Sequence, residues 1–298
     1  MKKTMIIAPA YMTVLADVKN LPKGNEEIDV ISMQEVPSGY GLLCSRVFQA
    51  FRFPYIAASM IGTNVYGDRI LEYADKQGID FTYTCEEDMG SVLVFRDPEG
   101  NTADMRVPGC ELNVDYDALA EEDIDEISRI VLSADMLNGE TVDDLLEYLF
   151  RTGKPAEVWM NDSIGHMKDD LVSDLLERKP LIVTEERYLK ELTGIGNDLK
   201  EAMEVLQKQT QADVVVLQNR TGVFLQHGSE RTLAEETGNI DTELFAALFA
   251  AGGAAGLSVP RRIAFALKLA SARYTRKHLD QGRWEFEKQT LKENILEN

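Results

Sequence analysis

The sequence predicts an α/β protein with a doubly wound, mostly parallel β-sheet flanked by helices and a second, small β-sheet. After about residue 128, short continuous apolar segments alternate with amphipathic helical ones. Strands that are apolar throughout are typical of a parallel sheet that helices cover on both faces. Residues 27–37 instead alternate apolar with polar side chains, and 90–107 has the pattern of a hairpin. We therefore expect these segments to form a separate sheet with one solvated face.

The strand candidates of the main sheet are short and are bounded by turn or helix signals. They are residues 4–9, 55–62, 130–137, 156–161, 180–185 and 212–218. The hairpin at 90–107 turns through Asp-Pro-Glu-Gly-Asn, a sequence of residue types that favour tight turns.

Helical periodicity predicts helices from Tyr40 to Phe51 and from about Tyr66 to Lys76, with Gly78 as the C-cap of the second. Further helices are expected at 143–153, 169–179 and 199–210, followed by a long helical group from Glu243 to about His278. We find no linker, repeat or low-complexity stretch in the 298 residues, which indicates one domain over 1–298.

Composition excludes several classes of function. The formal charge of −20 would repel a nucleic-acid backbone. No apolar run approaches the roughly 20 residues that span a bilayer. Pro9 and Asp17 interrupt the apolar start, which favours a buried strand over a signal peptide. The three cysteines are widely spaced and form no Cys-x-x-Cys pair. They predict reduced thiols in a cytoplasmic protein rather than a disulfide or a metal site.

Several segments follow one another in an order that resembles the ribokinase-like, or PfkB, carbohydrate kinases. Residues 61–80 (IGTNVYGDRILEYADKQGID) are similar to a glycine-spaced segment of that family. The later segments with this resemblance are GKPAEVWMND, EERYLKELTG, VVVLQNRTGVFL and LFAALFAAGGAAGLSVPRRIAFALKLA. The resemblance covers nearly the whole chain. It implies a ribokinase-like fold whose small sheet, from about 11–38 and 82–108, is a lid over the substrate site.

The resemblance also implies ATP-dependent phosphoryl transfer to a sugar or nucleoside hydroxyl, with ATP and Mg²⁺ bound if the protein is active. In this chemistry a carboxylate accepts the hydroxyl proton, and backbone N–H groups at a helix N-terminus stabilise the phosphoryl oxygens. The family supplies the base and this anion hole in a Gly-Ala-Gly-Asp sequence that opens a helix.

Two registers align that motif with this chain. The register of the following helix places Ile240, Asp241 and Thr242 on the anion hole and Glu243 on the base. A shift of two residues makes Asp241 the base instead. A third interpretation needs no catalysis, because Asp241 or Thr242 would be an ordinary helix N-cap with Glu243 in the first turn.

Most of the other site positions implied by the resemblance carry different residues from those of the family, whereas Gly39 and Gly222 match. The substrate-binding positions correspond to Tyr11 and Thr13 on the first lid strand, and to Ser38, Gly39, Tyr40 and Leu43. The nucleotide-side positions correspond to Glu185, Asn219 and Gly222, and Glu185 or Glu186 remains available for a metal. Leu43 has no group that could hydrogen-bond a sugar hydroxyl.

Two functions therefore stand at this point. The first is an ATP-dependent kinase for a sugar or nucleoside. The second is a non-catalytic protein of the same fold that binds a small molecule or acts as a dimeric regulatory or structural protein. A dinucleotide-binding oxidoreductase is disfavoured because no Gly-x-Gly-x-x-Gly follows the first strand. The small sheet has exposed edges that need cover, so a homodimer through the lid is expected. Nucleic-acid and membrane partners are not.

Overall fold

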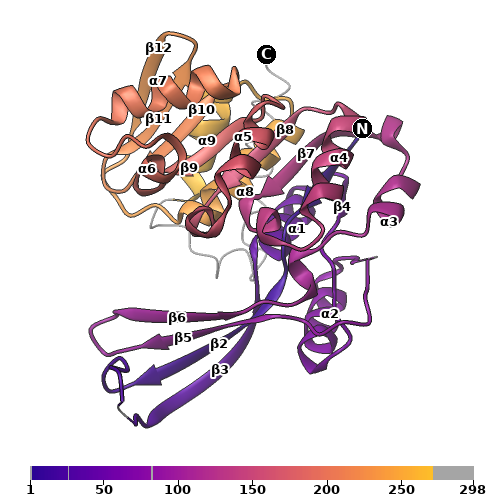
Figure 1. Ribbon diagram of the computed structural model, residues 1–298, viewed down its shortest axis with the longest axis vertical. Coiled ribbons are helices and arrows are strands. Elements are labelled where there is room, and N and C mark those ends of the chain that lie inside the picture. The colour runs from indigo at the N-terminus through magenta and orange to yellow at the C-terminus, as the bar shows by residue number, and fades with distance from the viewer. Residues whose placement is uncertain (1, 26, 82, 271–298) are drawn as a thin grey trace.

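A computed structural model describes residues 2–25, 27–81 and 83–270 and contains two β-sheets (Figure 1). The larger sheet has eight strands in the order β12-β11-β10-β9-β8-β7-β1-β4. Its strands from β4 to β10 are parallel, and β11 and β12 extend it antiparallel. The predicted mostly parallel α/β fold is confirmed. The strands are β1 Lys3–Ile7, β4 Tyr55–Ala57, β7 Ile127–Ser133, β8 Ala156–Met160, β9 Leu181–Glu185, β10 Val214–Gln218, β11 Gly222–His227 and β12 Glu230–Glu235.

Helices cover both faces of this sheet. The α-helices are α1 Tyr40–Phe51, α2 Val65–Gln77, α3 Tyr116–Glu121, α4 Val142–Thr152, α5 Asp169–Leu176, α6 Leu189–Thr193, α7 Leu199–Thr210, α8 Thr242–Ala254 and α9 Val259–Ala270. Short 3₁₀ helices lie at η1 Cys110–Leu112, η2 Ile124–Glu126, η3 Ala134–Asn138, η4 Asp162–His166 and η5 Glu186–Tyr188. In the part of the chain that the structure describes, no helix has the length and apolar character needed to cross a membrane.

The apolar strands divide their side chains between two cores, as their uninterrupted hydrophobicity predicts. Met5 and Ile7 of β1 belong to one core with residues of α2, α4 and α7, whereas Ile6 belongs to the other with residues of α1, α8 and α9. Successive side chains of a strand point to opposite faces, so a sheet covered twice needs apolar residues at every position.

The predicted helical group after Glu243 forms two helices. α8 is buried around most of its circumference and includes the stacked rings of Phe245 and Phe249, 6.0 Å apart. Gly256, with φ +79°, turns the chain between α8 and α9. The remainder of the predicted group, 271–278, lies outside the described residues.

The small sheet has the order β3-β2-β5-β6 and projects from the main body (Figure 1). Its strands are β2 Tyr11–Val18, β3 Val30–Ser38, β5 Ser91–Arg96 and β6 Thr102–Val107. The predicted hairpin is β5–β6, and its turn is closed by the Asn101 N–H, which donates to Asp97 Oδ1 at 2.9 Å. β3 carries exposed apolar side chains, with Met33 62% exposed.

One predicted strand is shorter than expected. Only Tyr55–Ala57 of the segment 55–62 pairs with β1, because β1 ends at Ile7 and the chain then leaves for the small sheet. Beyond Ala57 the segment continues with isolated contacts, such as the bridge between Ile61 and Thr84.

Glu111 anchors the base of the small sheet, where β5 begins and β6 ends. Its carboxylate accepts hydrogen bonds from the N–H groups of Gly90 at 2.8 Å and Gly109 at 3.2 Å. Both positions require glycine because the contact is close. A Cβ atom on Gly90 would overlap the Glu111 carboxylate, and one on Gly109 would overlap the backbone at Gly90. Glu111 is only 2% exposed, and this burial raises the pKa of its carboxyl group although the backbone N–H groups oppose the shift.

The raised pKa of Glu111 predicts a pH dependence of stability. The folded protein holds this proton over a range above the ordinary value of 4.5 in which the unfolded chain has lost it. The stabilisation is complete below 4.5 and is lost as the pH rises through the folded-state pKa. Urea denaturation across this range should show the stability of the wild type falling with pH relative to Glu111→Gln. The exposed residue Glu99 provides a control, because Glu99→Gln removes a carboxyl group of the same kind away from this contact.

Candidate active site

A cavity of about 800 Å³ lies where the small sheet meets the carboxyl edge of the main sheet. Strands β2, β5 and β6 line one side of it, and the segments after β7, β8 and β9 line the other, together with the first turn of α8. Ligands of open α/β sheets bind outside the carboxyl ends of the strands. The fold therefore favours this cavity as the site for a small molecule, and polar side chains line it.

Asp135 is the most buried charged group of this cavity. Its carboxylate accepts hydrogen bonds from Arg106 at 2.8 Å, from Ser133 Oγ at 2.7 Å and from Asn161 Nδ2 at 2.6 Å. The Asp135 side chain is 4% exposed, whereas that of Arg106 is 34% exposed. Arg106 belongs to β6 and Asp135 to the segment after β7, so this ion pair joins the two sheets across the cavity.

Arg106 also lies 5.7 Å from the ring centroid of Tyr11. Burial raises the pKa of the Tyr11 phenol far above its ordinary value, and nearby carboxylates, Glu243 first among them, add to the shift. The phenol therefore stays protonated at any physiological pH and is available as a hydrogen-bond donor.

Glu185 connects the end of β9 to the start of α8. It accepts a hydrogen bond from Thr242 Oγ1 at 3.1 Å and forms an ion pair with Arg187 at 2.9 Å. The Arg187 guanidinium lies 4.7 Å from the ring centroid of Tyr188. Burial raises the pKa of Tyr188 to about 12 despite this cation. All four of these side chains line the cavity.

The first turn of α8 separates the two candidate bases. Asp241 is the N-cap, and its Oδ1 accepts a hydrogen bond from the Leu244 N–H at 3.1 Å. Glu243 lines the cavity and Asp241 does not. Of the other residues assigned to the anion hole, Thr242 lines the cavity and Ile240 is buried in the core on the α8 side of the sheet.

The remaining predicted positions fall into two groups. Tyr11, Thr13 and Tyr40 line the cavity, and the Tyr40 ring lies 6.4 Å from that of Trp159. The others lie outside the lining: Ser38 donates to the Val36 carbonyl, Gly39 makes a close turn against Pro9 with φ +103°, Leu43 is buried in the core, and Asn219 and Gly222 flank the turn between β10 and β11. Glu186, the alternative metal ligand, instead accepts a hydrogen bond from Gln218.

Sequence reasoning missed Asp135, Asn161 and Arg106. A signal existed for the first two, because Asp135 and Asn161 follow β7 and β8 within two residues and so lie at the ligand-binding edge. Arg106 carries no such signal, since an arginine in an exposed hairpin strand is indistinguishable in sequence from a solvated one. Within the described ranges, no group of three or more His, Cys, Asp or Glu residues is arranged to hold a metal ion.

Comparisons with known proteins agree with this geometry. The family model described as pfkB family carbohydrate kinase matches residues 1–284. A ribokinase from Thermotoga maritima has a similar structure, with a TM-score of 0.79 and 17% identity, over 100% of both chains. An Arabidopsis thaliana ribokinase complexed with ribose and ATP matches with a TM-score of 0.73, 18% identity and 91% of each chain. A Burkholderia thailandensis nucleoside kinase in complex with inosine matches with a TM-score of 0.71 and 14% identity, over 90% of this chain and 88% of that one. No curated protein sequence matches significantly.

The Arg106–Asp135 pair should stabilise the protein more than an exposed pair of the same kind. Arg106→Met leaves a buried carboxylate without its cation and should lower the free energy of unfolding by about 1–3 kcal/mol, after allowance for the partial exposure of Arg106. The matched control is Arg96→Met in the same sheet. Arg96 pairs with Asp17, the two side chains being 45% and 31% exposed, so its loss should cost less than about 1 kcal/mol. Equal losses in urea denaturation would contradict this assignment.

Proposed function

Because the chain belongs to the pfkB family of carbohydrate kinases, we propose that it transfers the γ-phosphoryl group of ATP to a hydroxyl group of a small sugar or nucleoside. The substrate would bind in the cavity between the two sheets. The ribose and inosine bound by the Arabidopsis and Burkholderia proteins are both polyhydroxylated molecules of the size that this cavity accommodates.

The cavity wall supports recognition of hydroxyl groups. Asp135 accepts hydrogen bonds, Arg106 donates them, and Asn161 does both, so the three provide partners for hydroxyls in either role. Tyr11 and Tyr188 add apolar ring surface and phenolic donors. Mixed groups of this kind orient a ligand by directional bonds within an otherwise enclosing pocket.

The observation that carries the proposal is the position of Glu243 on the cavity wall in the first turn of α8. A carboxylate there can accept the proton of a substrate hydroxyl as its oxygen attacks the γ-phosphate. We assign the base to Glu243 rather than Asp241, because the Asp241 side chain caps the helix.

Magnesium would neutralise charge on the phosphates of ATP. Glu185 on the cavity wall would supply a carboxylate oxygen of the kind that this ion prefers. The nucleotide would extend from there toward the carboxyl ends of β9 and β10, past the turn that contains Asn219 and Gly222.

A second function, ligand binding without phosphoryl transfer, is favoured by one specific feature. The Asp241 carboxylate already accepts from a free N–H at the N-terminus of α8, in the position where the phosphoryl oxygens would need donors. Its negative charge repels phosphate, and Ile240 and Thr242 replace residues that would let the backbone approach it closely. The chain would then be a binding or regulatory protein.

We further propose that the protein is cytoplasmic and forms a homodimer through its small sheet. The exposed apolar side chains of β3, among them Ile31 and Met33, support contact of this sheet with a second copy.

Turnover by variants of the α8 start tests the assignment of the base. ATP consumption with Mg²⁺ is measured against pentoses, hexoses and nucleosides, beside thermal-shift binding of the same compounds. Glu243→Gln should lower kcat about 100- to 10,000-fold on the active substrate, with ligand binding retained. Asp241→Asn is the matched control, because asparagine caps a helix as well as aspartate does.

Each outcome of this experiment has a distinct meaning. Loss of turnover in Asp241→Asn but not in Glu243→Gln would transfer the role of base to Asp241. Binding of a sugar or nucleoside by the wild type with no ATP consumption would establish the second function. If no compound of the panel either binds or is turned over, the cavity is not a sugar or nucleoside site.

A further inference from the structure

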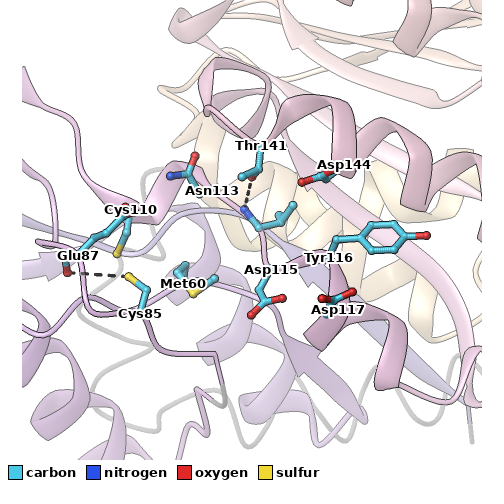
Figure 2. Close-up of a pocket in the computed structure, with 11 residues that line it drawn as sticks. Met60, Cys85, Glu87, Cys110, Asn113, Asp115, Tyr116, Asp117, Thr141 and Asp144 are labelled. Carbon is cyan, nitrogen blue, oxygen red and sulfur yellow. Dashed lines mark hydrogen bonds between the residues drawn. The ribbon is translucent and has the colours of Figure 1, made fainter.

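Cys85 and Cys110 come from different segments, and their thiols meet at the base of the small sheet. Cys85 lies in the segment that leads into β5, and Cys110 follows β6 as the first residue of η1. Figure 2 shows the two sulfur atoms turned toward each other, and the Cys85 thiol donates a hydrogen bond to the Glu87 carbonyl at 3.9 Å. The third cysteine, Cys44, is buried in α1 within the opposite core.

Hydrogen bonds fix the backbone on both sides of this thiol pair. The Cys85 N–H donates to the Ile61 carbonyl at 3.0 Å, and the Cys110 N–H donates to the Asp88 carbonyl at 3.0 Å. Asp88 itself lies in the segment that contains Cys85. The backbone of Cys110 is therefore hydrogen-bonded to the segment that contains Cys85.

The pair also borders a second cavity, of about 490 Å³, which is distinct from the substrate cavity (Figure 2). Met60, Glu87 and Thr141 are among its other lining residues, and none of its lining residues lines the substrate cavity. Cys85 is partly exposed, whereas Cys110 is only 1% exposed. A small reagent can therefore reach Cys85 directly, and Cys110 is reached through Cys85.

We propose that Cys85 and Cys110 are a redox-active dithiol that forms a reversible disulfide by exchange with a low-molecular-weight disulfide. The Cys85 thiolate attacks one sulfur of the reagent, which releases the first small thiol and leaves a mixed disulfide on Cys85. The Cys110 sulfur then attacks Cys85 Sγ and displaces the second small thiol. The two protons lost by the protein thiols end on the two released thiols, and the reagent is reduced as the protein is oxidised.

The environment of each sulfur sets this order of attack. Burial raises the pKa of the Cys110 thiol, and the neighbouring Cys85 thiol raises it further. Only the thiolate is an effective nucleophile, so Cys110 is a poor first attacker. As a resolving thiol it needs no encounter with a reagent in solution, since its target is already in contact with it.

The disulfide would act on the attachment of the small sheet. The segment from Cys85 to Gly90 enters the sheet, and the segment from Gly109 to Leu112 leaves it. Glu111 already holds these segments together through Gly90 and Gly109. A disulfide beside Glu111, with an S–S bond of about 2 Å, would link the same two segments covalently until it is reduced. The oxidised protein should therefore have a stiffer connection between its two sheets.

Peptide mapping with glutathione disulfide tests the pairing directly. Trypsin places each cysteine on its own peptide: 24–46 with Cys44, 77–96 with Cys85 and 107–129 with Cys110. We expect 77–96 to become linked to 107–129, with 24–46 unlinked. The thiols titratable in denaturant should fall from three to one per chain, and dithiothreitol should restore them.

Single variants distinguish the roles of the two thiols. Cys110→Ser removes the resolving thiol and should trap a stable glutathione adduct on Cys85. Cys85→Ser should give no adduct, because Cys110 is shielded. Cys44→Ala should form the link as the wild type does. Hydrogen exchange supplies a readout independent of activity: oxidation should slow exchange of the amides in 88–90 and 109–113 in the wild type but not in Cys85→Ser.

Several results would overturn the proposal. One is a glutathione adduct on Cys85 that accumulates in the wild type without closing to the intramolecular link. Another is a link that includes Cys44 or joins two chains. A link without any change in hydrogen exchange would retain the dithiol but refute its effect on the small sheet. None of these outcomes depends on whether the protein phosphorylates a sugar.

Discussion

The ion pair between Arg106 and Asp135 is the interaction on which the arrangement of the cavity between the two sheets depends. The small sheet projects from the main body, so its position over the carboxyl edge must be held by contacts at its base and across the cavity (Figure 1). Ser133 and Asn161 of the main-sheet side hydrogen-bond to Asp135, and Arg106 links Asp135 to the small sheet. A buried carboxylate with three partners costs little to keep in place, whereas one that has lost its cation is costly. The same group that joins the two sheets therefore also lines the cavity.

The start of α8 brings two demands into competition. A helix that is buried along most of its length needs its first N–H groups satisfied, and Asp241 does this from within the chain. Phosphoryl transfer needs the same N–H groups for an anion. Glu243, two residues after Asp241, lines the cavity and does not interfere with the cap. The proposed base therefore lies beside an N–H donor that the Asp241 side chain already occupies. In the proposed reaction, the rate of phosphoryl transfer would depend on whether those donors are released when ATP binds.

The base of the small sheet is a second point at which a few atoms control a large element. Glu111, Gly90 and Gly109 form a contact too close for any other side chain at the glycine positions. The thiols of Cys85 and Cys110 lie beside it. We expect a local change at this contact, whether protonation of Glu111 or the proposed oxidation of the thiols, to affect the small sheet, whose strands β2, β5 and β6 line the cavity.

The sequence by itself determined the architecture of the main sheet, the hairpin β5–β6 and the C-cap of α2 at Gly78. These features depend on local pattern: continuous apolar strands require two covered faces, and turn residues have fixed backbone preferences. It also singled out Glu243, Tyr11 and Glu185, which line the cavity. Tertiary structure decided which carboxylate at the start of α8 lines the cavity. Asp241 and Glu243 both carry a carboxylate, so the sequence alone does not show which of the two side chains points into the cavity. It likewise decided the partnership of Arg106 with Asp135 and the meeting of Cys85 with Cys110. Such contacts join residues 25 or more positions apart, and no local periodicity records them.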